Sequence, residues 1–202
     1  MLVSRARARA TAPNDPARDA IYHARMSTLN NDARADWEAR VAATWKIADA
    51  LTPQELVRTI DALCSERPVD DPFAQFERAC ARDTAGIERE AEPLYRAALA
   101  SGALDPYRHA RASIQLGSTL KHLGRLDESE ALLLAQLERC RAEGPGAALF
   151  DEVRAVLAFT WIAQGRALEA AALALETLAP HLSRYNRSMA ANARALRNAP
   201  GY

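Results

Sequence analysis

The sequence predicts an all-α fold of about three stacked helical hairpins, with capping helices at both ends. Three observations predict this class. The 202 residues include 45 alanines but only 12 valines and isoleucines together, and β-branched residues are the ones that sheets favour. A glycine recurs between two stretches of helical periodicity, at Gly86, Gly124 and Gly165. Small residues recur at fixed distances before and after each of these glycines.

Charge and composition exclude several classes of partner. Lys+Arg and Asp+Glu number 26 each, so no net positive field is available to hold a nucleic acid or an anionic membrane. The longest apolar stretches fall far short of the roughly 18 to 20 residues that a membrane span needs. Three cysteines without a C-x-x-C pair give neither a disulfide framework nor zinc-ligand spacing. We therefore expect a cytoplasmic protein that binds no nucleic acid and no membrane.

Residues 1–31 are expected to form a flexible N-terminal tail. The first 25 residues contain five arginines and only two acids, which is also the composition of an organellar transit peptide. Met26 begins a segment with better helix-start chemistry, so the residues before it could instead be an upstream mis-start. A tail or a mis-start is the favoured interpretation.

An N-terminal helical hairpin is expected to cap the stack over residues 32–66. Trp37, Val41 and Trp45 lie at helical spacing in its first half. The run Thr52-Pro53-Gln54-Glu55 is a capping box with proline at the first helical position, which predicts that a second helix begins there.

Three helical hairpins are predicted within residues 70–180, at about 72–104, 110–143 and 151–180. Each repeated glycine supplies the left-handed conformation that ends the first helix of a hairpin. Small residues are expected where the two helices cross, because close approach of helix axes needs small side chains; the facing pairs are Ala79 with Ala91, Gly117 with Ser129, and Ala158 with Ala170. Leucines such as Leu133, Leu157 and Leu178 are expected to fill the core.

The last segment, residues 181–202, is expected to be a C-terminal capping helix and tail. The run from Leu182 to Leu196 has helical spacing, with Tyr185, Met189 and Leu196 predicted to face inward.

The stretch from Ala110 to Glu138 combines a Leu-Gly pair, a glycine turn, an Asp-Glu helix start and a small crossing residue. With these residues the chain resembles the tetratricopeptide repeat family, and from Asp71 to Tyr185 it is similar to a group of short bacterial members, often called group 5. The resemblance implies a right-handed α-α superhelix whose inner groove binds proteins. Two departures stand out: the repeats are spaced by 38 and 41 residues instead of 34, and Arg78 and Arg82 replace large apolar residues.

The resemblance also implies where a partner binds, because the first helix of each repeat lines the inner groove. The partner is a protein or peptide of unspecified identity. The candidate groove residues form an aromatic end, a basic and polar middle and an apolar end: Phe73, Phe76, Arg111, Gln115, Ser118, Lys121, His122, Val156 and Phe159. The phenylalanines could instead pack against neighbouring helices, and the sequence leaves this alternative open.

Catalytic signatures are almost absent, so we expect no enzyme, no catalytic residue, no cofactor and no metal. The run Ser118-Thr119-Leu120-Lys121 fits S-x-x-K, but the S-D-N and K-T-G companions of that motif are missing. Two functions remain: a non-enzymatic protein-binding module, or a self-associating homodimer that pairs through the apolar third hairpin, including Phe159 and Ile162, and the terminal helix.

Overall fold

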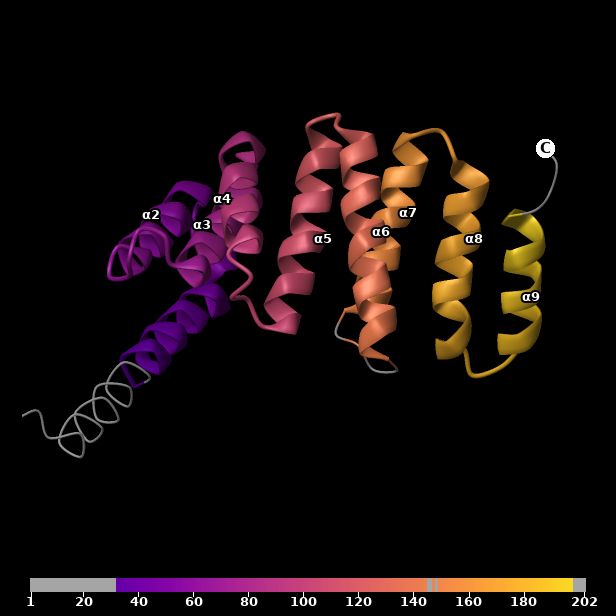
Figure 1. Cartoon of the computed structure of the whole chain (residues 1–202), viewed down its shortest axis with the longest axis horizontal. Coiled ribbons are helices and arrows are strands. Elements are labelled where there is room, and N and C mark those ends of the chain that lie inside the picture. The colour runs from indigo at the N-terminus through magenta and orange to yellow at the C-terminus, as the bar shows by residue number, and fades with distance from the viewer. Residues whose placement is uncertain (1–31, 145–146, 148, 198–202) are drawn as a thin grey trace, which may run out of the picture. The chain divides into compact units, whose positions relative to one another are not determined.

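The computed structural model describes residues 32–144, 147 and 149–197, and every regular element in these ranges is a helix (Figure 1). The predicted all-α class is therefore confirmed. The predicted tail, residues 1–31, lies outside the described residues. The chain divides into two compact units, Met1–Ala43 and Thr44–Tyr202.

In the first unit, the described residues 32–43 are helical. Ion pairs one helical turn apart join Arg34 to Glu38 at 3.1 Å and Arg40 to Asp36 at 3.0 Å. Pairs one helical turn apart near the surface add a few tenths of a kcal/mol each.

In the second unit, each α-helix packs against the next along the chain, so that α2 to α9 follow one another in a row (Figure 1). The hairpins are α3 with α4, α5 with α6, and α7 with α8. The elements are η1 (Ala48–Ala50), α2 (Pro53–Cys64), α3 (Pro72–Thr84), α4 (Glu88–Ala100), α5 (Pro106–His122), α6 (Leu126–Glu143), α7 (Phe150–Ala163), α8 (Ala167–Leu178), η2 (Ala179–His181) and α9 (Asn186–Arg197).

Three helices begin with the same device, a capping side chain followed by proline. At α2, the Thr52 hydroxyl accepts from the Glu55 amide, and the Glu55 carboxylate accepts from the Thr52 amide at 2.9 Å. Asp71 caps α3 and Asp105 caps α5 through their carboxylates. Proline loses nothing at the first helical position, where an amide hydrogen would have no helical acceptor. The predicted capping box is confirmed.

The repeated glycines end the first helix of each hairpin as predicted. Their φ angles are +70° at Gly86, +78° at Gly124 and +80° at Gly165, a region that residues with a Cβ rarely adopt. At Gly124, the amide of Arg125 donates to the carbonyl of Leu120 at 2.9 Å, and the glycine amide donates to Lys121. The same two bonds close the other two turns. This is the Schellman arrangement, which satisfies the last carbonyls of a helix.

The predicted small-residue crossing is present between α5 and α6. The Ser129 hydroxyl donates to the carbonyl of Gly117 at 2.7 Å. A Cβ placed on Gly117 would lie 2.8 Å from the side chain of Leu133, closer than carbon atoms can approach. Any side chain larger than hydrogen at position 117 would therefore force Leu133 to move.

The core runs through the hairpins in two clusters. The first joins α3, α4 and α5 around Phe76, Tyr95 and Leu120, and the second joins α6, α7 and α8 around Leu133 and Leu157. The three free cysteines, Cys64, Cys80 and Cys140, are buried, as small apolar side chains usually are.

Two expectations at the C-terminal end are wrong. Leu178, predicted to be core, is 46% exposed, because no described helix covers its side of α8. Tyr185, predicted to face inward, has φ +70° and is 72% exposed. The chain leaves η2 in an extended conformation at Leu182, and α9 begins only at Asn186, whose amide donates to the Leu182 carbonyl at 2.7 Å.

The arginines at usually apolar positions of α3 make ion pairs with neighbouring helices. The guanidinium of Arg82 donates to both carboxylate oxygens of Asp61 on α2, at 2.9 and 3.0 Å, and to Glu90 on α4 at 3.2 Å. Arg78 lies 3.7 Å from the same Asp61. Paired charges thus replace part of the apolar contact between α2, α3 and α4.

Candidate protein-binding surface

The aromatic side chains predicted at one end of the groove, on α3, are covered by other residues of the chain. Phe73 and Phe76 are both buried. The guanidinium of Arg108 lies 5.2 Å above the Phe73 ring, and that of Arg111 lies 5.1 Å above the Phe76 ring. Trp45 also packs against this cluster, and its indole donates to Glu77 at 2.7 Å. Both rings therefore pack inside the protein, which is the alternative that the sequence leaves open for them.

The predicted middle of the groove is a polar face of α5, which we call the α5 stripe: Arg111, Gln115, Ser118, Lys121 and His122. His122 is exposed and the other four are half-buried. Arg111 also lies 6.0 Å from the ring of Tyr107, and Gln115 accepts from the Cys80 thiol at 3.2 Å. Lys121 lies 3.1 Å from the neighbouring His122 ring. The stripe therefore carries a cationic side chain at each of its ends, Arg111 and Lys121.

The predicted apolar end, on α7, is the most exposed part of the candidate site. Val156 is half-buried against the second core cluster. Phe159 and Ile162, one turn apart on the same helix, are 60% and 54% exposed. Large apolar side chains exposed together in this way commonly mark a binding surface.

These two residues belong to a hollow between α7 and α8, which we call the α7–α8 groove. Its volume is about 710 Å³. Its walls are almost entirely apolar, with Ala155, Phe159 and Ile162 from α7 and Ala171, Ala174 and Leu178 from α8. The α8 side was missed from the sequence, although Ala171 and Ala174 stand where the preceding repeat carries the larger residues Glu130 and Leu133.

One end of the α7–α8 groove is acidic. Asp151 and Glu152 lie in the first turn of α7 and line the groove. Asp151 accepts a hydrogen bond from the ring of His181 at 2.9 Å. Glu152 is exposed and has no ion-pair partner within the described residues.

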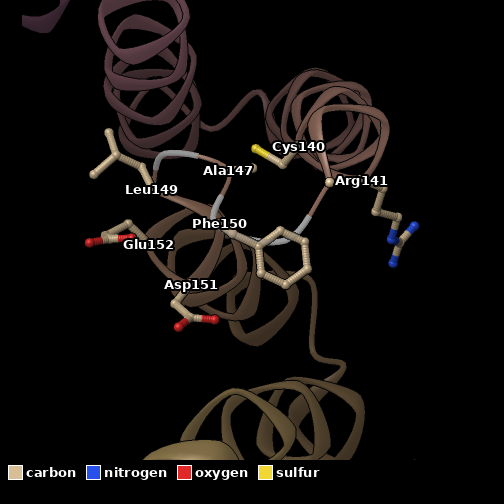
Figure 2. A pocket seen from close by; sticks show the side chains of 8 residues that line it. Cys140, Arg141, Ala147, Leu149, Phe150, Asp151 and Glu152 are labelled. Carbon is tan, nitrogen blue, oxygen red and sulfur yellow. The ribbon is translucent and has the colours of Figure 1, made fainter.

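A second pocket of about 480 Å³ lies where α6 ends and α7 begins (Figure 2). The Cys140 thiol points from α6 towards Ala147, while Arg141 points away from the hollow (Figure 2). Leu149 precedes α7 with φ +60°, a strained conformation for leucine. Arg141 pairs with Glu138 and Asp151 pairs with His181, so these groups do not converge on a reaction centre.

A third pocket of about 890 Å³ is lined by arginines of α7 and α9 around a single carboxylate. Glu176 accepts from Arg154 at 3.4 Å and from Arg197 at 2.7 Å. Burial lowers the pKa of Arg154, and the carboxylate of Glu176 opposes that shift. Sequence analysis missed this cluster because arginine is so abundant in the chain that no single one stands out.

Within the residues that the structure describes, no group of three or more His, Cys, Asp or Glu side chains is placed to hold a metal ion. None of the described helices combines the length and the apolar character required to cross a membrane.

Successive helix pairs closed by glycine turns, with a small-residue crossing between α5 and α6, define a helical-repeat protein. The tetratrico peptide repeat model matches residues 72–196, which is more than half of the chain. The chain belongs to the tetratricopeptide repeat family. No curated protein and no solved structure matches it.

Proposed function

We propose that this chain is a non-enzymatic protein-binding module of the cytoplasm that presents the faces of α5 and α7 to a protein or peptide partner. Proteins of this family generally act as interaction scaffolds, not as enzymes. The observation that carries the proposal is the pair Phe159 and Ile162, two large apolar side chains exposed in an apolar groove. Exposing them to water costs free energy that burial against a partner recovers.

The α5 stripe adds charge selectivity to this surface. Arg111 and Lys121 are ten residues apart on one helix, which corresponds to about 15 Å along the axis. Both could contact one extended segment, and the stripe contains no acidic residue. We therefore propose that the part of the partner lying along α5 is acidic. Charge-assisted hydrogen bonds to a carboxylate contribute about 1.5 to 3 kcal/mol when they are shielded from water.

The test is a double charge reversal, Arg111→Glu with Lys121→Glu. A partner captured from the native source on the wild-type chain should bind the double variant at least about tenfold more weakly, and added salt should weaken the wild-type complex. The matched control is Arg58→Glu with Arg89→Glu, which makes the same charge change on exposed arginines of α2 and α4. Equal affinity of wild type and double variant would exclude the α5 stripe.

Self-association is the second candidate function, and the exposed Phe159 and Ile162 also favour it. In this case the third hairpin of one copy buries these residues against a second copy. Sedimentation equilibrium over a range of concentrations distinguishes the two functions, because a dimer that Ile162→Glu dissociates would support self-association.

A further inference from the structure

The α7–α8 groove has an internal counterpart one repeat earlier in the chain. Gly165 lies 41 positions after Gly124, so Ala174 and Leu178 on α8 correspond to Leu133 and Leu137 on α6. Leu133 and Leu137 are both buried, whereas Leu178 is half exposed. The same surface of the repeat is thus covered in one hairpin and open in the next.

A helix provides the cover in the earlier repeat. There α7 packs against both α5 and α6, and its buried residues Val153, Leu157 and Thr160 recur at helical spacing. In the last repeat, the next helix along the chain is α9. It packs on α8 and η2 and makes no comparable contact with α7, so the corresponding position beside α7 is unfilled by any described helix.

We propose that the α7–α8 groove is a seat for one amphipathic helix of a partner protein, lying parallel to α7 with a basic first turn. This inference rests on the proposed function, because it names the form and chemistry of the partner. The parallel direction follows from the hairpins: α5 and α7 are each the first helix of a pair, so a helix that repeats the position of α7 repeats its direction.

The groove floor suits a helix because it is made of small side chains. Ala155, Ala171 and Ala174 leave room for a helix axis to approach to about 8 Å, the lower limit for packed helices. The apolar face of the docked helix would then lie between larger side chains of the groove wall, namely Phe159, Ile162 and Leu178. By analogy with α7, that face would carry apolar residues at positions i, i+4 and i+7.

The acidic end of the groove favours a docked helix whose first turn carries basic side chains. A helix parallel to α7 brings its N-terminus to Asp151 and Glu152, which line that end. These carboxylates would attract the positive N-terminal end of the docked helix and any basic side chains in its first turn. Glu152 is exposed and has no ion pair within the described residues, so it is available for this contact.

Shape argues against a second copy as the occupant. Two copies placed groove to groove would enclose two hollows of about 710 Å³ each instead of filling them. A concave apolar surface is filled by a convex one, and unfilled apolar hollows forfeit dispersion contacts.

The test uses two synthetic, helix-stapled peptides of about 14 residues, long enough to span α7. Both carry valine, leucine and valine at positions i, i+4 and i+7. One has two lysines in its first turn and the other has two glutamates there. The peptides are titrated by calorimetry into the full chain, with circular dichroism confirming that every variant retains its helicity.

The basic peptide should bind the wild-type chain at least about tenfold more tightly than the acidic peptide. Glu152→Lys should abolish or invert this preference. Ala171→Glu, an exposed position on the groove floor, should weaken both peptides at least about tenfold. Glu143→Lys is the matched control, because it reverses an exposed carboxylate of α6 away from the groove and should change neither affinity.

Several outcomes overturn the proposal. One is the absence of binding by either peptide up to about 1 mM, and another is equal binding to wild type and Ala171→Glu. A wild-type dimer that Ala171→Glu converts to a monomer would make a second copy the occupant. A captured partner that is lost from the Arg111→Glu, Lys121→Glu variant but kept by Ala171→Glu would reject this seat and leave the proposed function standing.

Discussion

At the scale of single residues, one half-buried carboxylate beside the α5 stripe has a perturbed pKa. Asp83 on α3 accepts a hydrogen bond from the Thr119 hydroxyl at 2.9 Å and one from the Tyr95 hydroxyl at 3.4 Å. Burial raises the pKa of Asp83, and these two hydrogen bonds oppose that shift. Three helices, α3, α4 and α5, therefore meet at one polar contact inside an otherwise apolar cluster.

This raised pKa predicts a specific pH dependence for Asp83→Asn. When a carboxyl has a higher pKa in the folded protein than in the unfolded chain, the protein becomes less stable as pH rises between those two pKa values. The reason is that the folded state must then hold a partly buried negative charge. The melting temperature of the variant minus that of wild type should therefore increase between about pH 3 and pH 7.

Thermal unfolding monitored by circular dichroism at several pH values measures this difference. Asp70→Asn is the control, since that carboxylate is exposed and has no ion pair within the described residues; its difference should stay flat. A difference for Asp83→Asn that falls as pH rises would show that the hydrogen bonds outweigh burial.

Some residue-scale features could be predicted from the sequence and others could not. The glycine turns could, because a left-handed residue at a helix end strongly favours glycine and recurs at a fixed repeat position. The burial of Phe73 and Phe76 could not. It depends on Arg108, Arg111 and Trp45, which come from segments whose packing on α3 has no local signature.

At the scale of helices, the crossing of α5 and α6 leaves no room for a side chain at Gly117. Gly117→Leu should destabilise the fold by roughly 1 to 3 kcal/mol or more, because the added side chain must displace Leu133 or push the helices apart. Ala131→Leu adds similar volume on the exposed face of α6 and should be nearly neutral. Urea unfolding of both purified variants gives the comparison, and an unchanged Gly117→Leu midpoint would contradict the assigned crossing.

The sequence predicts the start of a helix correctly where a capping residue marks it. The predicted start of α9, which rests on apolar spacing alone, is wrong. Thr52-Pro53 and Asp105-Pro106 begin α2 and α5 as expected. The start of α9 was placed too early, because apolar spacing extends back to Leu182 while the chain there is extended. The spacing of apolar residues gives no sign that the Asn186 side-chain amide donates to the Leu182 carbonyl and closes a turn before α9.

At the scale of the second unit, stability should be graded along the row of helices. In a stacked repeat each element is held mainly by its neighbours, so interior helices have partners on both sides and terminal ones do not. α5 packs against α3, α4, α6 and α7, whereas α9 packs on α8 and η2 and has a single buried residue, Ala193.

Hydrogen exchange followed by mass spectrometry should detect this gradient. Amides of α9 should exchange first and amides of α5 and α6 last, because local opening of a terminal helix breaks the fewest contacts. Equal protection of α9 and α5 would contradict the graded picture and indicate that this unit opens only as a whole. The sequence of a single repeat could not predict the open α7–α8 groove. The groove is open because α9, the helix after the last hairpin, packs on α8 and η2 instead of covering α7.

The hydroxyl pair between Ser129 and Thr160 has a consequence for how neighbouring hairpins are registered. The Ser129 hydroxyl donates to the Gly117 carbonyl at 2.7 Å and lies 2.9 Å from the Thr160 hydroxyl, which also donates to the Val156 carbonyl of its own helix at 3.2 Å. Alanine and leucine surfaces can shift past one another by small steps at little cost, whereas a shift of α7 along α6 would also break this buried contact between two hydroxyls. The hydroxyl contact between α6 and α7 therefore favours the observed register of the second and third hairpins over positions shifted along the helix axes.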